Sequence, residues 1–405
     1  MRIRPLAGLF FLAGAFGACE NFDPRLTTPQ SDFVWQLPAN IPLPRELADN
    51  PMTDAKVELG RHLFYEKRLS GNGSFSCATC HHQSHAFADD PNIDDGSADF
   101  AQAGTDRILT AKGSTGEFHP RNSMQLVNLA WQPVLTWGNP LMLRLHLQAQ
   151  VPIFGENPIE LGLIGFEDAR LSQIRSDAVY QKLFAAAYPA AGSAVTMGNI
   201  TRALEVFQRS VIGFDSPYDR FSRGEAGAMS ASAVNGFNMF FSEDFECFHC
   251  HGGINFTNSE DHSRKAFAEI DFANNGLYNV GGTGAYPTGN TGIHAVTGIA
   301  SDMGRFKAPT LRNVALTAPY MHDGSIADLD GVLDHYARGG RLVASGPNAG
   351  DGSLSPFKNS FVKGFTLTPT QRADLIAFLQ SLTDSKFITN SAYANPWPSG
   401  HANNN

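Results

Sequence analysis

The chain of 405 residues lacks several features that would assign a protein quickly to a class. Alternating strand patterns are scarce, so a sheet protein is not expected. The net charge is −9 and no basic stripe is visible, which argues against nucleic acid as a partner. The glycine-rich run at 274–298 is followed by no Gly-Lys-Ser/Thr and is therefore not a phosphate-binding loop. Beyond the first 18 residues, no segment is long and apolar enough to span a membrane.

Residues 1–18 differ from the rest of the chain. Arg2 and Arg4 form a short basic region, and residues 6–16 are apolar and rich in small side chains. This stretch is too short to cross a bilayer, and its pattern is typical of an export signal peptide. We therefore expect a mature protein that acts outside the cytoplasm.

Only five cysteines are present, and Cys19 stands apart from the other four. It ends the segment G-A-F-G-A-C, which resembles a lipobox except that Phe16 stands where leucine is usual. An isolated cysteine at the end of a signal predicts lipidation, and hence a membrane tether. The alternative is an ordinary cleavage nearby that discards Cys19 or leaves it free. Residues 19–50, rich in proline and asparagine, would form an extended linker.

The other four cysteines lie in two C-x-x-C-H motifs, at 77–81 and 247–251. This is the attachment signature of a c-type haem. Two thiols three positions apart can add to the vinyl groups of one porphyrin, and the following histidine can ligate the iron. We expect two haems, bound covalently through Cys77, Cys80, Cys247 and Cys250 and ligated by His81 and His251.

A zinc site or a thioredoxin-like redox pair would fit these motifs less well. Zinc-binding C-x-x-C pairs usually lie about 15 to 20 residues apart, whereas these are 170 positions apart (77 to 247). A thioredoxin-like pair would not need a histidine after both second cysteines. Because haem c is attached outside the cytoplasm, the motifs agree with the export signal and predict a periplasmic protein.

Helical patterns flank both motifs. We expect helices at 52–65, 199–214 and 230–241, and a further helix after the capping box at 368–371. The predicted fold is mainly α, with two cytochrome c-like domains that carry one covalent haem each, plus long loops. The predicted boundaries are 51–225 for the N-terminal haem domain, 226–385 for the C-terminal haem domain and 386–405 for a tail.

Two C-terminal motifs resemble those of the bacterial di-haem cytochrome c peroxidase superfamily. They are F-K-A-P-T-L-R-N-V at 306–314 and T-A-P-Y-M-H-D-G at 317–324. The resemblance extends from about Lys56 to Thr383. It implies an oxidoreductase that uses hydrogen peroxide, and it makes the N-terminal domain the peroxidatic one.

In that superfamily the residue fourteen positions after the histidine of P-Y-x-H-D-G is the sixth ligand of the C-terminal haem. Ordinary peroxidases have methionine there, whereas this chain has Tyr336. This is similar to the MauG branch, whose haem is His–Tyr ligated, and to the MauG-like di-haem enzymes associated with methanobactin operons. The methanobactin-associated type is the most similar, through residues 113–120 and 135–137. A phenolate would favour ferric and higher oxidation states, whereas a thioether favours ferrous iron.

Without the family spacing, Tyr336 could be a plain core tyrosine. It lies on the apolar face of a helix expected from Ser325. Three other side chains are alternative ligands of the second haem: Met303, Met321 and His322.

The segment 148–160 matches the family's distal-pocket motif. The resemblance assigns the glutamine, proline and glutamate of that motif to Gln148, Pro152 and Glu160. Glu160 would be the general acid/base that moves a proton between the peroxide oxygens. The spacing is two residues longer than usual, so Glu156 is a rival.

Ordinary peroxidases often carry a second histidine that closes the first haem, sixteen residues after the proximal one. Here that position is Ser97, which implies a haem that is ready for peroxide without reductive activation. His82, His85 and His119 could still close the site, but isolated histidines are more often surface or supporting residues.

Trp137 lies where the family places a tryptophan between the two haems, and Trp131 is the alternative. The resemblance implies that Trp137 passes an oxidising equivalent from one haem to the other. The competing assignment is a buried core tryptophan. The resemblance also implies a Ca²⁺ between the domains, held by Asn122 and by the carbonyls of Thr317 and Pro319, since hard oxygen ligands suit calcium.

These expectations combine into one function. Hydrogen peroxide would generate high-valent haem, and the stored oxidising equivalents would oxidise a residue of a partner protein, expected to be tryptophan, by long-range electron transfer. The partner could be a small exported metal-binding protein. Two alternatives stay open: a conventional cytochrome c peroxidase supplied by a small cytochrome, and a di-haem electron carrier without catalytic activity.

Overall fold

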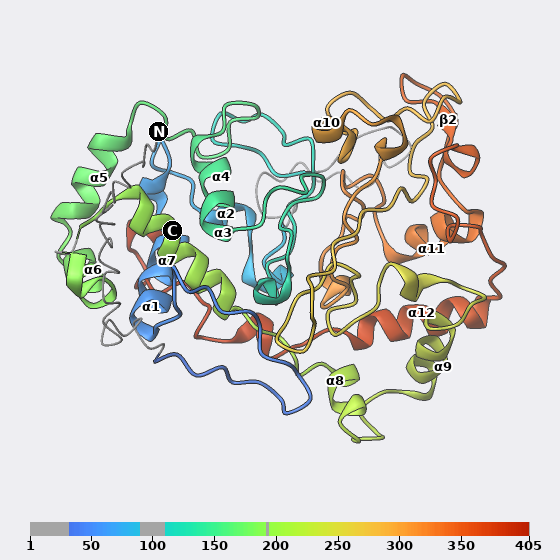
Figure 1. Cartoon of the computed structure of the whole chain (residues 1–405), viewed down its shortest axis with the longest axis horizontal. Helices are drawn as coiled ribbons and strands as arrows, with labels where there is room; N and C mark the ends of the chain where they lie inside the picture. The colour runs from blue at the N-terminus through green and yellow to red at the C-terminus, as the bar shows by residue number, and fades with distance from the viewer. Residues whose placement is uncertain (1–31, 90–109, 192–193, 405) are drawn as a thin grey trace, which may run out of the picture. The chain divides into compact units, whose positions relative to one another are not determined.

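A computed structural model describes residues 32–89, 110–191 and 194–404 (Figure 1). The predicted signal peptide, Cys19 and Ser97 lie outside these residues. The described chain is largely helical, and its single sheet there pairs two antiparallel strands, β1 Leu342–Val343 and β2 Gly350–Asp351. None of the helices in the described ranges is long and apolar enough to cross a membrane. The α-helices are α1 Asp54–Phe64, α2 Cys77–Cys80, α3 Leu145–Gln148, α4 Gln150–Phe154, α5 Glu167–Ser176, α6 Ala178–Ala187, α7 Met197–Ser210, α8 Pro217–Ser222, α9 Ala231–Phe240, α10 His294–Thr297, α11 Leu329–Arg338 and α12 Pro369–Ser381.

The helix before the first haem motif packs against a helix far along the chain. α1 begins after an N-cap at Thr53, whose side chain accepts from the backbone N–H of Lys56, and it packs closely on α7. The crossing point is Gly60: a Cβ there would lie 2.1 Å from the carbonyl oxygen of Ala203. Glycine is therefore required for this close backbone approach.

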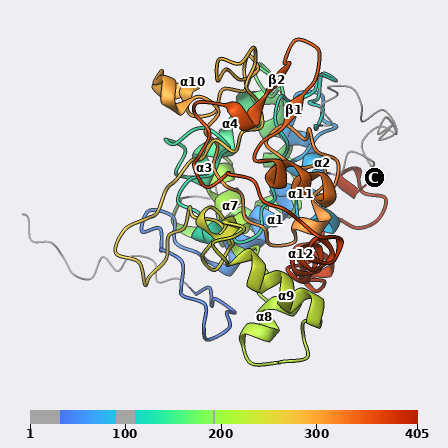
Figure 2. The same ribbon diagram turned by 90° about the vertical axis from the view of Figure 1, so that its right-hand side faces the viewer.

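The same crossing is repeated around the second haem motif. α9 packs closely on α12, and a Cβ on Gly236 would lie 2.0 Å from the carbonyl oxygen of Asp374. α12 opens with the predicted capping box, in which Thr368 and Gln371 bond reciprocally. The four helices expected from the sequence pattern are thus confirmed within two or three residues at most ends. Figure 2 shows α12 between α9 and α11.

The repeat extends to a turn that follows each haem motif. Asn128 and Asn313 both adopt left-handed backbone conformations, with φ of 56° and 58°. The backbone N–H of Asn128 donates to the carbonyl of Val211, and that of Asn313 donates to the carbonyl of Leu382. Val211 and Leu382 are the C-caps of α7 and α12. The C-terminal ends of α7 and α12 are therefore held by the same kind of backbone hydrogen bond.

Each helix pair has its own hydrophobic cluster. The cluster around α1 and α7 includes Leu63, Phe64 and Phe207, and the cluster around α9 and α12 includes Phe240 and Phe378. Burial of aromatic side chains contributes much of the stability of such cores.

The predicted tail, 386–405, is part of the first cluster. Phe387 and Trp397 are buried there, and the Asn403 amide donates to the buried Glu66 carboxylate at 2.8 Å. The chain thus returns from the second helix pair to the first, which sequence patterns did not indicate.

The described part of the predicted linker, residues 32–50, is likewise packed rather than free. It has no helix or strand, but Ile41 is buried and the Trp131 indole donates to the carbonyl of Pro42 at 2.8 Å. Arg45 forms an ion pair with Asp261 at 3.0 Å. A free tether would therefore have to lie before these residues.

The helix crossings give the first prediction. Replacing Gly60 or Gly236 with alanine should lower the free energy of unfolding by about 1–3 kcal/mol or more, because the added Cβ meets backbone that cannot move aside. Gly227→Ala is the matched control, since nothing lies within 4 Å of its Cβ position. Urea unfolding of the three variants tests this. Equal stability of all three would show that the crossings are less tightly packed.

Candidate active site

The first haem motif begins on α2 and ends at His81. The imidazole Nδ1 of His81 lies 2.6 Å from the carbonyl oxygen of Phe87, so Nδ1 carries the proton and Nε2 is left for a metal. Burial lowers the pKa of His81, which favours the neutral ligand form. Cys77 and Cys80 are free thiols beside it.

The second motif has the same arrangement. The Nδ1 of His251 lies 3.0 Å from the carbonyl oxygen of Phe256, and burial lowers the pKa of this imidazole as well. Cys247, Cys250 and His251 line one cavity. Two free thiols and an oriented imidazole at one cavity wall are the donor set that a covalent haem requires. The residues present therefore fit c-type haem at both motifs.

Tyr336 lines the same cavity as the second motif. It lies on α11, whose N-cap is Asp328, so the helix starts later than the expected Ser325. Leu329 and Leu333, on the same helix face, also line the cavity. Burial raises the pKa of Tyr336 to about 12, and the Asn275 side chain acts in the opposite direction. This half-buried phenol thus lines the cavity that also carries Cys247 and Cys250, and its ligation of the second iron stays a prediction.

The alternative ligands are arranged differently. Met321 and His322 also line the cavity, whereas Met303 does not line it and packs in the adjoining hydrophobic cluster with Tyr286. The Met321 sulfur accepts a hydrogen bond from the Asn275 amide at 3.4 Å. His322 stacks on Phe306 with ring centroids 3.7 Å apart. The Met321 sulfur therefore has a hydrogen-bond partner, whereas the buried Nε2 of His322 has none, and both residues stay alternative ligands.

The predicted acid, Glu160, lies beside the first haem motif. Burial is the largest cause of the pKa shifts of Cys77 and His81, and the Glu160 carboxylate raises both pKa values. This carboxylate is therefore within electrostatic reach of both side chains. Its loop is held by hydrogen bonds from Leu161 N–H to the Pro152 carbonyl and from Ser114 N–H to the Glu160 carbonyl. Gln148 ends α3, one turn before Pro152. The rival Glu156 is exposed.

His119 is paired with Glu160, a contact that the sequence did not indicate. Its Nε2 lies 3.5 Å from the Glu160 carboxylate, and the backbone N–H of Arg121 donates to its Nδ1. Nδ1 also lies 3.0 Å from the carbonyl oxygen of Arg121, so its contacts fit either tautomer of the neutral imidazole. The 113–120 motif was the available signal: Gly113 packs so closely on the Ile159 carbonyl that a Cβ would lie 1.8 Å from it. His82 and His85 are half-buried near His81.

The two candidate tryptophans differ in environment. Trp137 lines the second haem cavity together with Ala88, which follows the Phe87 partner of His81. Its indole donates to the carbonyl of Asn122 at 2.8 Å. Trp131 is fully buried between Trp35 and Phe214 in another cluster. Trp137 therefore lies at the second haem cavity, whose lining extends to Ala88, whereas Trp131 has the surroundings of a core residue.

Two of the three expected calcium ligands lie together. The Asn122 side-chain amide is 2.6 Å from the carbonyl oxygen of Pro319, and the Asn122 N–H donates to the carbonyl of His322. The hydroxyl of Thr317 donates to the carbonyl of Val314 at 3.1 Å. The Asn122 nitrogen, and not its side-chain oxygen, faces the Pro319 carbonyl, so calcium binding here stays a prediction.

Comparisons with known proteins identify the family of this chain. The family model for di-haem cytochrome c peroxidase matches residues 54–227. The methylamine utilization protein MauG of Methylorubrum extorquens is 30% identical over 347 residues, which cover 85% of this chain and 82% of MauG. The cytochrome-c peroxidase IdrP1 of Denitromonas iodatirespirans is 31% identical over 363 residues, which cover 85% of this chain and 84% of IdrP1. The chain therefore belongs to the di-haem cytochrome c peroxidase family, whose members are oxidoreductases that act on hydrogen peroxide.

Solved structures refine the similarity. The crystal structure of a MauG-like protein associated with microbial copper homeostasis is 43% identical, with a TM-score of 0.84 over 90% of this chain and 100% of that chain. The diheme peroxidase BthA from Burkholderia thailandensis is 17% identical, with a TM-score of 0.62 over 85% of this chain and 90% of BthA, and shares the fold. The family implies two c-type haems, which agrees with the prediction from the two motifs.

Proposed function

We propose that this protein uses hydrogen peroxide to oxidise a residue of a partner protein, a tryptophan, at a distance. The observation that carries the proposal is Tyr336, a half-buried phenol on the wall of the cavity that holds Cys247, Cys250 and His251. A phenolate ligand stabilises oxidised iron, which suits storage of oxidising equivalents better than reduction of a small cytochrome.

Bound at the two motifs, the haems would supply the reaction with peroxide and hold the oxidising equivalents. The chain's own residues do the rest. Glu160 moves a proton between the two oxygens of peroxide, and His119 orients its carboxylate. Gln148 and Pro152 shape the pocket beside it. Trp137 relays an electron between the two haems, a role supported by its place on the second haem cavity together with Ala88, which follows the Phe87 partner of His81.

The partner protein is inferred from two observations. The sequence has no motif for a small organic substrate, which agrees with chemistry at a distance. The 43% identical neighbour is described as associated with microbial copper homeostasis. We therefore propose a small exported metal-binding protein as the substrate. We further propose a periplasmic location, with lipid attachment at Cys19, which lies outside the described residues.

The experiment is direct. The haem-loaded protein is mixed with hydrogen peroxide and the candidate partner, and the partner is then digested for mass spectrometry. Oxygen addition at a tryptophan, dependent on both peroxide and this protein, is expected. Rapid peroxide turnover with reduced cytochrome c and an unmodified partner would instead favour a conventional peroxidase, for which Met321 is the available thioether. Low-spin ferric signals unchanged by peroxide would favour an electron carrier.

The tryptophans give a paired prediction. Trp137→Phe should slow the sharing of oxidising equivalents after peroxide addition, measured by stopped-flow absorption. Trp131→Phe should leave that rate unchanged and lower the free energy of unfolding by about 1–3 kcal/mol, because its buried indole loses packing and leaves the Pro42 carbonyl without its donor. If Trp131→Phe slowed this rate and Trp137→Phe did not, Trp131 would be the residue that relays the electron.

Calcium remains a prediction with its own test. Metal analysis of the purified protein should find about one Ca²⁺ per chain, and Asn122→Ala should remove it, because the side-chain oxygen is a proposed ligand. A calcium-free protein with normal haem content would eliminate the site.

A further inference from the structure

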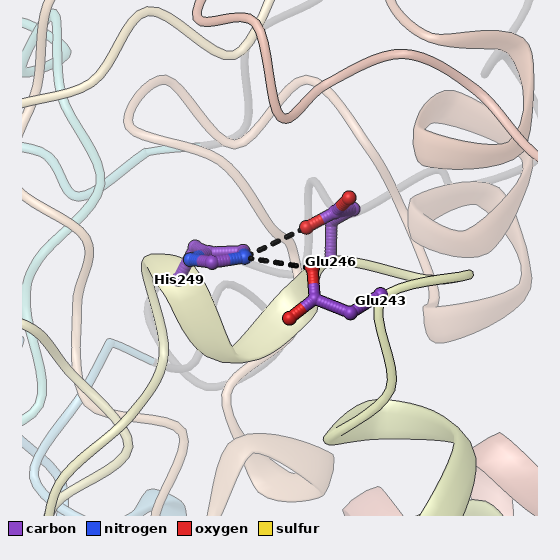
Figure 3. Close-up of side chains that lie close together, drawn as sticks. All are labelled: Glu243, Glu246 and His249. Atoms are coloured by element: carbon purple, nitrogen blue, oxygen red, sulfur yellow. Dashed lines mark ion pairs between the residues drawn. The ribbon is translucent and has the colours of Figure 1, made fainter.

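Three side chains at the second haem motif form a group that the proposed reaction does not use: Glu243, Glu246 and His249 (Figure 3). Within the described ranges, this is the one group of three or more histidine, cysteine or acidic side chains close enough to share an ion. The Nε2 of His249 lies 2.7 Å from Oε2 of Glu246 and 3.6 Å from Oε2 of Glu243. Figure 3 shows this nitrogen directed toward both carboxylates.

The buried ligand atoms of the group have each other as partners. Oε2 of Glu246 and Nε2 of His249 are shielded from solvent and form an ion pair 2.7 Å long, and neither atom bonds to a residue outside the group. The Glu246 side chain is only 9% exposed. A buried carboxylate needs a compensating positive charge or hydrogen bond. A cation placed between the two atoms would supply that charge and would be ligated by both.

The surroundings hold these atoms in place. Lys363 donates to the other oxygen of Glu246, Oε1, at 2.6 Å, which leaves Oε2 to face His249 and holds the pKa of this carboxyl below its usual range. The ring of Phe361 stacks on His249 with centroids 3.8 Å apart and planes 6° apart. Such supporting contacts are typical of metal ligands.

We propose that Glu243, Glu246 and His249 bind one divalent transition-metal ion of the Zn²⁺ or Cu²⁺ class. One imidazole and two carboxylates suit these ions, whereas Ca²⁺ and Mg²⁺ prefer oxygen ligands alone. Glu243 is 78% exposed, so the ion can exchange with solvent. Glu246, Phe361 and Lys363 also line the second haem cavity, so the ion would lie at its rim, separate from the iron position served by His251.

Metal titration tests the proposal. The full-length protein with both haems, treated with chelator and dialysed, is titrated with ZnCl₂ in a calorimeter. One Zn²⁺ is expected to bind per chain, and Glu246→Gln and His249→Gln should each weaken binding at least tenfold. His62→Gln is the control, since His62 has one carboxylate neighbour, Glu58, at 3.3 Å. Excess CaCl₂ should not compete.

Copper gives a second readout. The electron paramagnetic resonance spectrum of bound Cu²⁺ should show coupling to one imidazole nitrogen, and His249→Gln should remove it. Haem content should be unchanged, because the residues between the two cysteines make no bond to haem. If that variant loads haem poorly, Glu243→Gln, whose side chain is largely exposed, should still weaken zinc binding tenfold. The absence of stoichiometric zinc binding by the parent protein, or binding that persists unchanged in all three variants, would overturn the proposal.

Discussion

Replacement of Tyr336 by phenylalanine is expected to abolish the long-lived two-electron-oxidised state that peroxide should produce in the parent protein. The phenyl ring fills the same space on α11 but removes the oxygen that would donate charge to the second iron. Without that donor, the oxidised state should decay at least tenfold faster. Absorption spectra recorded after one equivalent of peroxide measure both its yield and its lifetime.

Tyr336→Met is the informative companion variant. A thioether in this place should raise the reduction potential of the second haem and move the protein toward ordinary peroxidase behaviour, with faster turnover of reduced cytochrome c. His335→Gln on the same helix is a control, because His335 bonds the Asn275 carbonyl rather than lining the cavity. If the oxidised state of Tyr336→Phe lived as long as that of the parent protein, Tyr336 would be a core residue. The assignment of a MauG-type function would then be wrong.

Glu160→Gln is expected to slow the reaction with hydrogen peroxide by about 10²–10⁴-fold, the usual contribution of a positioned acid/base. Glutamine keeps the shape and the loop contacts of Glu160 but cannot accept the peroxide proton. Glu156→Gln is the matched control: it is four residues away, exposed, and should change the rate little. Stopped-flow measurement of the first haem's absorption after mixing with peroxide gives the rate.

The Glu160→Gln and Glu156→Gln variants show which of the two glutamates is the general acid/base. A large effect of Glu156→Gln with none of Glu160→Gln would reverse the assignment. His119→Gln should have a smaller effect than Glu160→Gln, since His119 acts through the carboxylate. Loss of activity in His119→Gln equal to that of Glu160→Gln would make the histidine the proton carrier.

The sequence predicted what depends on local spacing. Both haem motifs are contiguous, and the helices around them are set by apolar periodicity and by caps such as the Thr368–Gln371 box. The position of Tyr336 on the cavity wall could be predicted because Tyr336 lies one helical turn from Leu333 on the same helix face.

Features that depend on distant backbone were not predictable from patterns. The His119–Glu160 pair exists because a loop at Gly113 packs on the backbone of Ile159, far along the chain. The contact of Asn403 with Glu66 joins residues 337 positions apart. Only tertiary packing creates such proximity, and no periodicity records it.

The most direct test of the central claim is the resonance Raman spectrum of the ferric protein with both haems. Bonding of the Tyr336 oxygen to the second iron predicts vibrations of an iron-bound phenolate, which shift when ring-deuterated tyrosine is incorporated and disappear in Tyr336→Phe. A parent spectrum without tyrosinate vibrations, or one that is identical in the Tyr336→Phe variant, would contradict the account.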